Sequence, residues 1–154
     1  NQFGLDVLAG KNPFGVSDDA SLEHYLATVF HNRDARPWVP WPATSIYVAQ
    51  RKRDAAFEQG VLDKIGRGDE RFLPGAEAAY ISQPALLLWC RQDKVIDASA
   101  MTLYAERIPQ ASQVLLDGCG HMSLMERPGE TAEAVAMMIE RGAPGATPPT
   151  GEPQ

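Results

Sequence analysis

The stretch PALLLWCRQD, residues 84–93, decides the fold of this chain. Its centre, residues 85–90, is an unbroken run of apolar side chains that follows a proline and ends at a polar turn. A short apolar run of this kind is typical of a β-strand buried on both faces of a parallel sheet. We therefore expect a central strand at residues 85–90.

The sequence after this run alternates between helical and strand patterns. A short helix is expected at residues 99–107, capped by Ser99, and a second strand at residues 113–116. A longer helix should begin at Pro128 and end at Arg141, because proline is favoured in the first turn and apolar residues recur on one face. Strand, helix, strand and helix in this order predict an α/β fold with parallel neighbouring strands.

Two strands are too few for the sheet that this pattern implies. A central strand needs a partner on each edge, and residues 84–141 contain one further strand pattern. We therefore expect the sheet to be incomplete, with other strands supplied by sequence outside this chain. A small complete α/β domain with unrecognised strands is the alternative.

The preceding part of the chain carries helical patterns. Apolar residues at helical spacing indicate one helix over residues 18–31 and a second over residues 43–64. Gly60 is expected to break or kink the second helix. Three prolines exclude a helix through most of residues 36–44.

Two side chains that can cooperate in catalysis follow the two strands. Asp93 lies three residues after the first strand, and His121 lies in a glycine-flanked turn after the second. Both should lie at the same edge of a parallel sheet. A carboxylate that accepts the His Nδ1–H fixes the tautomer and leaves Nε2 free as a general base. Each residue alone is more often an ordinary turn or loop residue, so the prediction depends on the pair.

Two segments resemble the C-terminal third of α/β-hydrolases: PALLLWCRQDKVID at residues 84–97 and CGHMSLMERP at residues 119–128. The spacing of 28 residues from Asp93 to His121 matches that family, and Glu-Arg-Pro matches the opening of its last helix. Within the family, the segments look most like the monoacylglycerol lipase and esterase branch. The resemblance implies that Asp93 is the acid and His121 the base of a catalytic triad.

The resemblance also implies a domain organisation. Residues 84–141 correspond to the C-terminal part of the hydrolase core, with parallel strands and flanking helices. Residues 1–83 correspond to a helical cap or lid inserted before these strands. The remaining residues, 142–154, hold four prolines and three glycines and are expected to form a disordered tail.

The nucleophile of that family lies in a Gly-x-Ser-x-Gly turn. None of the seven serines of the chain has this pattern; Ser17 has a glycine two residues before it, but Asp19 two residues after it. We therefore expect the nucleophile and the oxyanion donors in a missing N-terminal part of the same protein. This chain alone should not hydrolyse esters.

The expected activity is hydrolysis of carboxylic esters, with monoacylglycerols among the candidate substrates. Other enzymes of the same fold stay open: epoxide hydrolases and haloalkane dehalogenases, which use an aspartate nucleophile with the same histidine, and carbon–carbon bond hydrolases. A non-catalytic α/β binding module is a further alternative. The residue at the upstream nucleophile position separates these functions.

Several aromatic and sulfur-containing residues give further expectations. Trp38, Trp41 and Met122 are candidates to line a hydrophobic pocket for a small-molecule ester or a lipid-like substrate. Cys90 stands where the family usually has glycine. If this position needs a positive φ or close packing, a cysteine there is strained. Cys90 and Cys119 are expected to be small buried apolar residues, not nucleophiles and not a disulfide framework.

Composition and charge exclude several partners. The 154 residues carry a net charge of −6, and the one basic cluster is residues 51–53, so no nucleic acid is expected. No apolar run reaches the length of a transmembrane helix. No cofactor and no metal is expected. The sequence leaves the compartment open, with the cytoplasm slightly favoured.

Overall fold

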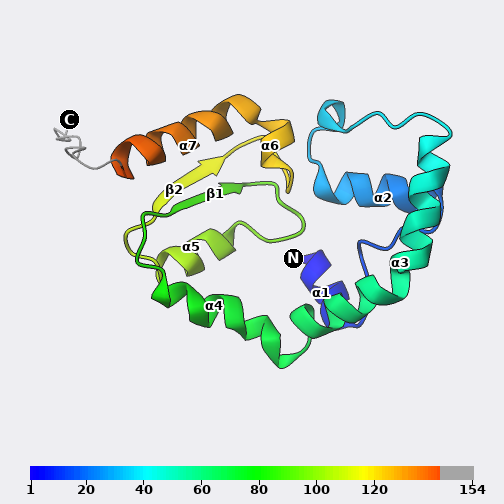
Figure 1. Cartoon of the computed structure of the whole chain (residues 1–154), viewed down its shortest axis with the longest axis horizontal. Helices are drawn as coiled ribbons and strands as arrows, with labels where there is room; N and C mark the ends of the chain where they lie inside the picture. The colour runs from blue at the N-terminus through cyan, green and yellow to red at the C-terminus, as the bar shows by residue number, and fades with distance from the viewer. Residues whose placement is uncertain (143–154) are drawn as a thin grey trace.

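The computed structural model describes residues 1–142, which form helices around a small parallel sheet (Figure 1). The elements in chain order are α1 (Gln2–Leu8), α2 (Asp19–Val29), η1 (Arg33–Ala35), α3 (Ala43–Gly66), η2 (Asp69–Phe72), α4 (Leu73–Glu77), η3 (Ala78–Tyr80), β1 (Leu86–Cys90), α5 (Ser99–Ala105), β2 (Ser112–Leu116), α6 (Ser123–Glu126) and α7 (Pro128–Gly142). The tail expected at residues 142–154 lies outside the described residues, except for Gly142, which ends α7.

The two strands form a parallel pair, as the sequence predicts. Leu86 lies opposite Ser112, and Cys90 lies opposite Leu116. Helices α5 and α7 both contact β1, and Figure 1 shows them on opposite sides of the strands. Most of β1 is only half-buried, and Cys90 alone is fully buried. The reason is that β2 is the one strand that pairs with β1 within the described residues.

Helices α2 and α3 occupy the regions expected from apolar spacing. Asp18 caps α2, because its side chain accepts a hydrogen bond of 2.8 Å from the Ser21 backbone N–H. Helix α3 runs without interruption through Gly60, so the expected break there is wrong. A Cβ at Gly60 would meet nothing within 4 Å. A single glycine costs a helix only about 1 kcal/mol, which the flanking turns outweigh.

The cap of α5 differs from the expectation. Ser99 is the first residue of the helix and makes no side-chain cap; instead, Asp97 Oδ1 accepts a hydrogen bond of 3.0 Å from the Ser99 backbone N–H. Hydrogen bonding with Ser99 also holds the pKa of Asp97 below its ordinary value. Asp97 therefore takes the role that the sequence assigned to Ser99.

The end of α2 and the residue after it pack against the turn that follows β1. Val29 and Phe30 pack with Val95, which lies two residues after Asp93. Figure 1 shows α1, α2 and α3 on one side and the strands with α5 and α7 on the other, where α4 lies below α5. This junction lies next to the carboxyl ends of both strands.

Candidate active site

The structure brings Asp93 and His121 together at the carboxyl ends of β1 and β2. Asp93 Oδ2 lies 3.0 Å from His121 Nδ1. The Asp93 side chain is 7% exposed and the His121 side chain 34% exposed. The Asp93 carboxylate is therefore shielded from water, while the His121 imidazole is partly exposed.

Asp93 is oriented by its own turn. Its Oδ1 accepts hydrogen bonds from the backbone N–H groups of Val95, at 2.8 Å, and Ile96, at 3.1 Å. These bonds direct Oδ2 toward His121. An ionised carboxylate only accepts hydrogen bonds, so with Asp93 in that form the contact requires the proton on Nδ1 and leaves Nε2 as an acceptor.

His121 is held by a tight turn that only glycine permits. The backbone N–H of His121 donates a hydrogen bond of 2.9 Å to Val29 O. A Cβ on Gly120 would lie 2.8 Å from His31 N and 3.1 Å from Val29 O. Gly118 has a φ of 71°, in the left-handed region that favours glycine. The two glycines thus let the turn that carries His121 approach the loop that follows α2.

Glu126 fastens these two loops to each other. Glu126 is buried, at 7% exposure, and its Oε1 accepts a hydrogen bond of 2.7 Å from Gly120 N. Oε2 accepts a hydrogen bond of 2.6 Å from Asn32 N. In the sequence, Glu126 marks only the start of the last helix. Its place in the Glu-Arg-Pro motif, five residues after His121, was the available signal.

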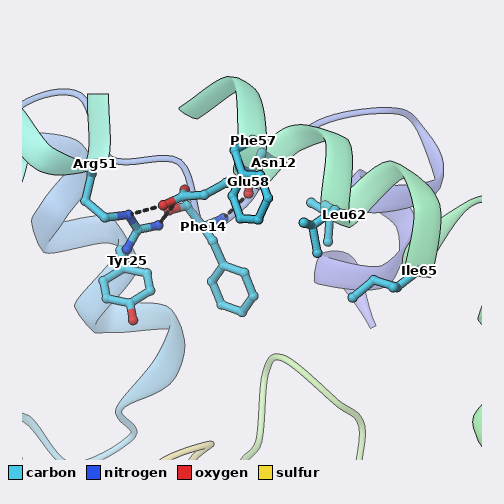
Figure 2. A pocket seen from close by; sticks show the side chains of 9 residues that line it. Asn12, Phe14, Tyr25, Arg51, Phe57, Glu58, Leu62 and Ile65 are labelled. Atoms are coloured by element: carbon cyan, nitrogen blue, oxygen red, sulfur yellow. Dashed lines mark hydrogen bonds and ion pairs between the residues drawn. The ribbon is translucent and has the colours of Figure 1, made fainter. Parts of the chain in front are cut away.

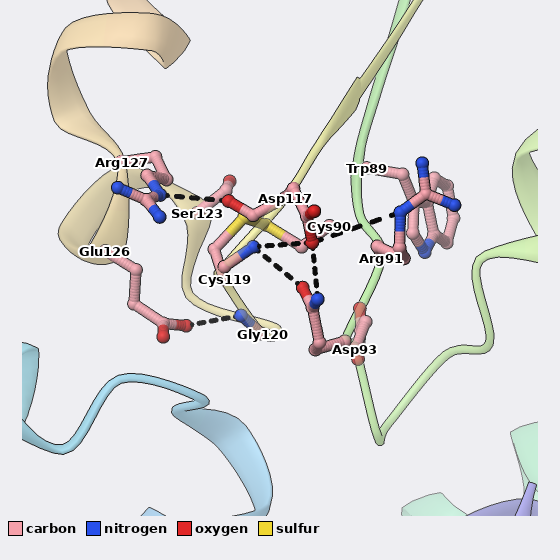
Figure 3. Close-up of a disulfide and its surroundings, with 12 residues drawn as sticks. Trp89, Cys90, Arg91, Asp93, Asp117, Cys119, Gly120, Ser123, Glu126 and Arg127 are labelled. Atoms are coloured by element: carbon pink, nitrogen blue, oxygen red, sulfur yellow. Dashed lines mark hydrogen bonds and ion pairs between the residues drawn. A yellow bond between two sulfur atoms is a disulfide. The ribbon is translucent and has the colours of Figure 1, made fainter.

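The two cysteines are joined in a disulfide, which corrects the expectation of two separate buried residues (Figure 3). Cys90 ends β1, and Cys119 lies in the turn after β2, with a Cα–Cα distance of 5.3 Å. Burial itself is as expected, since Cys90 is 2% and Cys119 0% exposed. No non-glycine residue among those described has a positive φ, so cysteine at position 90 causes no backbone strain. A sequence separation of 29 residues gave no sign of the pairing.

Gln92 and Asp117 make a second link between the same two turns. Gln92 Oε1 accepts a hydrogen bond of 2.9 Å from Gly118 N, and Gln92 Nε2 donates to Asp117 Oδ1. The bond from Gln92, together with one from the Gly118 backbone, lowers the pKa of Asp117. Sequence reasoning missed both residues, because each reads as an ordinary turn residue.

A mostly apolar pocket of about 490 Å³ lies beside the site. Side chains of α2 and α3 line it, together with Pro37, Val39, Met122 and Met125. Met122 is therefore placed next to His121 in the chain and at the pocket wall. Trp38 and Trp41 do not line this pocket and are 85% and 81% exposed. Pro37 and Val39 face the pocket, and Trp38 between them points outward.

A second pocket, of about 390 Å³, lies within the helical region (Figure 2). Arg51 on α3 forms an ion pair of 2.7 Å with Glu58 and donates a hydrogen bond of 2.7 Å to Phe14 O. Its guanidinium lies 5.1 Å from the centre of the Tyr25 ring, and burial raises the pKa of Tyr25. These contacts tie α2 and α3 together. None of the predicted site residues lies in this pocket.

Within residues 1–142, no three His, Cys, Asp or Glu side chains gather closely enough to hold a metal ion. No helix in the described part of the chain has the length and apolar character needed to cross a membrane.

Comparisons with known proteins identify relatives of this chain. It is 38% identical over 55 residues to human monoacylglycerol lipase ABHD6, which covers 36% of this chain and 16% of the relative. It is 26% identical over 96 residues to Lipase 3 of Moraxella sp. (strain TA144), covering 62% of this chain and 30% of the relative. The chain thus spans less than a third of either relative.

Solved structures share the fold. A crystal structure of a membrane phospholipase A, described as a bacterial virulence factor, matches 92% of this chain and 45% of its own chain, with a TM-score of 0.71 and 26% identity. A family model described as alpha/beta hydrolase fold matches residues 20–128. With this match over most of its length, the chain belongs to the alpha/beta hydrolase fold family.

Proposed function

We propose that the chain supplies the acid and base of a Ser-His-Asp triad in a carboxylic ester hydrolase of the lipase or esterase type. The observation that carries the proposal is the 3.0 Å contact between Asp93 Oδ2 and His121 Nδ1, made while Asp93 Oδ1 is held by two backbone N–H groups. The relatives named as lipases support the reaction class.

In the proposed reaction, His121 Nε2 takes the proton of a serine hydroxyl as that oxygen attacks the ester carbonyl. Asp93 stabilises the imidazolium that forms. The same Nε2 then gives the proton to the leaving alcohol, and a water molecule deprotonated by His121 releases the acid. The serine and the oxyanion donors belong to a part of the protein that precedes this chain. By this proposal, residues 1–154 alone do not catalyse.

The pocket next to Met122 suits the apolar part of a substrate. Its volume of about 490 Å³ is in the range of small-molecule sites, and the side chains of Leu22, Leu26 and Phe30 give it an apolar wall. An ester with a hydrocarbon acyl chain fits this chemistry, monoacylglycerols among them. Met122 lines this pocket and follows His121 in the chain.

The test uses the whole protein that contains this chain, assayed on nitrophenyl esters of increasing acyl length. We expect His121→Ala to remove activity and His24→Ala, an exposed histidine on α2, to leave it unchanged. A fluorophosphonate probe should label one serine upstream of residue 1. Full activity in His121→Ala contradicts the triad.

The same probe separates the alternatives. Epoxide hydrolases and haloalkane dehalogenases carry an aspartate at the nucleophile position, which a fluorophosphonate does not label. Failure of labelling, together with turnover of an epoxide or haloalkane, replaces the ester hydrolase proposal with one of these reactions.

A further inference from the structure

The disulfide lies at the end of the strand pair, where the backbone pairing of β1 with β2 ends. The ladder of paired residues ends at Cys90 and Leu116. Beyond it, the chain continues three residues to Asp93 on one side and five residues to His121 on the other. Cys90 and Cys119 connect these two continuations, with the bond fully buried (Figure 3).

The noncovalent links between the same turns are individually weaker than a covalent bond, and two of them depend on the Gln92 side chain. Arg91 N donates to Leu116 O at 2.9 Å, and Gln92 N donates to Cys119 O at a longer 3.3 Å. The Gln92–Asp117 side-chain contact is exposed, so water competes for it. The base-bearing turn contains two glycines, which favour backbone freedom. A covalent connection is therefore the strongest constraint between the acid and the base.

We propose that Cys90 and Cys119 are positioning residues, whose disulfide holds the acid-bearing and base-bearing turns in the register that joins Asp93 to His121. This rests on the proposed function of that pair. Without the bond, the turn at residues 118–121 moves relative to residues 91–93, and the Nδ1–Oδ2 contact is made for only part of the time. A misplacement of about 1 Å in such a site can cost about 100-fold in rate.

The test compares the oxidised protein, the reduced protein and Cys90→Ala/Cys119→Ala. A trialkylphosphine reduces the bond: phosphorus attacks one sulfur, the S–S bond breaks, water gives phosphorus its oxygen, and each sulfur ends as a thiol. Iodoacetamide added to a denatured aliquot counts the thiols by mass. Since the chain has two cysteines, complete reduction yields two labelled thiols from it.

The first readout is kinetic. We expect kcat on a nitrophenyl ester to fall about 10- to 100-fold in the reduced protein and in the double variant, with KM unchanged. Reoxidation with oxidised glutathione should restore the reduced protein. The double variant should respond to neither reagent, which makes it the control for side effects of both.

The second readout does not depend on activity. The Nδ1–H proton that His121 shares with Asp93 is observable in water by NMR, and we expect its signal to broaden through solvent exchange when the disulfide is absent. If the signal and kcat both persist and only the midpoint of thermal unfolding falls, the bond stabilises the fold without positioning the pair, and the proposal is wrong. Two free thiols in the folded, air-oxidised protein also overturn it.

These outcomes stay distinct from those of the proposed function. If the whole protein hydrolyses no ester, the proposed function fails, yet the proton signal in oxidised and reduced samples still decides whether the bond positions the pair. If His121→Ala is inactive and reduction has no effect on kcat or on the signal, the proposed function stands and the positioning role falls.

Discussion

At the scale of single residues, the Asp93 carboxylate divides its oxygens between two tasks. Asn at this position keeps the shape but turns one oxygen into an N–H₂ donor, which then faces either backbone N–H groups or His121 Nδ1–H. We expect Asp93→Asn to lower kcat of the whole protein about 10⁴-fold, as loss of the correct tautomer does in triad enzymes. Ester hydrolysis at saturating substrate measures it.

The matched control is Asp69→Asn, which changes an exposed aspartate in η2. It should keep wild-type kcat. Near-normal turnover by Asp93→Asn contradicts a role for this carboxylate in orienting the base.

Glu126 makes a different prediction, because it acts on backbone and not on substrate. Glu126→Gln places an N–H₂ group against Gly120 N or Asn32 N, so one buried backbone N–H loses its acceptor. We expect the free energy of unfolding to fall by about 1–3 kcal/mol. Urea denaturation followed by circular dichroism measures the change.

Glu130→Gln is the control for this change, since Glu130 is exposed and its contact with Arg127 is 3.9 Å. It should alter stability by less than about 0.5 kcal/mol. Equal effects of the two variants would mean that the buried hydrogen bonds of Glu126 contribute little.

At the scale of elements, the disulfide closes a loop that contains α5 and β2. The bond lowers the chain entropy of the unfolded state. For a separation of 29 residues, this raises the free energy of unfolding by about 3–4 kcal/mol. We expect Cys90→Ala/Cys119→Ala to lower the free energy of unfolding by this amount, measured by urea denaturation. A reductant should lower the midpoint of the wild type toward that of the variant, and an unchanged midpoint contradicts the loop-closure effect.

The elements also separate what sequence can predict from what it cannot. The strands at residues 85–90 and 113–116 and the helices at residues 18–31 and 43–64 follow from local periodicity, so they were predicted within a few residues of their observed bounds. The short helices α1, α4 and α6 were missed, because one or two turns leave too few residues for a period to show.

The site divides in the same way. Proximity of Asp93 and His121 follows from strand order, which a sequence reveals. The disulfide and the double acceptance by Glu126 depend on loops that meet only after folding, at sequence separations of 29 and 94 residues. The outward position of Trp38 and Trp41 depends on which way an irregular segment faces, and no period reports that.

At the scale of the whole molecule, β1 lies at the edge of the sheet, although its apolar sequence is typical of a central strand. β1 pairs with β2 on one side, and the described residues provide nothing for the other. Unpaired backbone groups and half-buried apolar side chains favour association with other chains. We expect the purified 154-residue chain to be poorly soluble and to show no turnover of short nitrophenyl esters.

Adding the segment that precedes this chain in the whole protein, as a second chain or as a fusion, should restore turnover. The measurement is nitrophenol release with and without that segment, using His121→Ala in the restored protein as the control. Stoichiometric turnover by the 154-residue chain alone, lost in His121→Ala, would mean that one of its own serines is the nucleophile.

The bond between Cys90 and Cys119 also bears on where this protein is made. Glutathione and thioredoxin keep thiols reduced in most cytosols, whereas the periplasm, the endoplasmic reticulum and the cell exterior let disulfides persist. Because both sulfurs are buried after folding, an oxidant reaches them most readily while the chain is still folding. A host that exports the chain through its secretory route should therefore return more correctly folded protein than one that retains it.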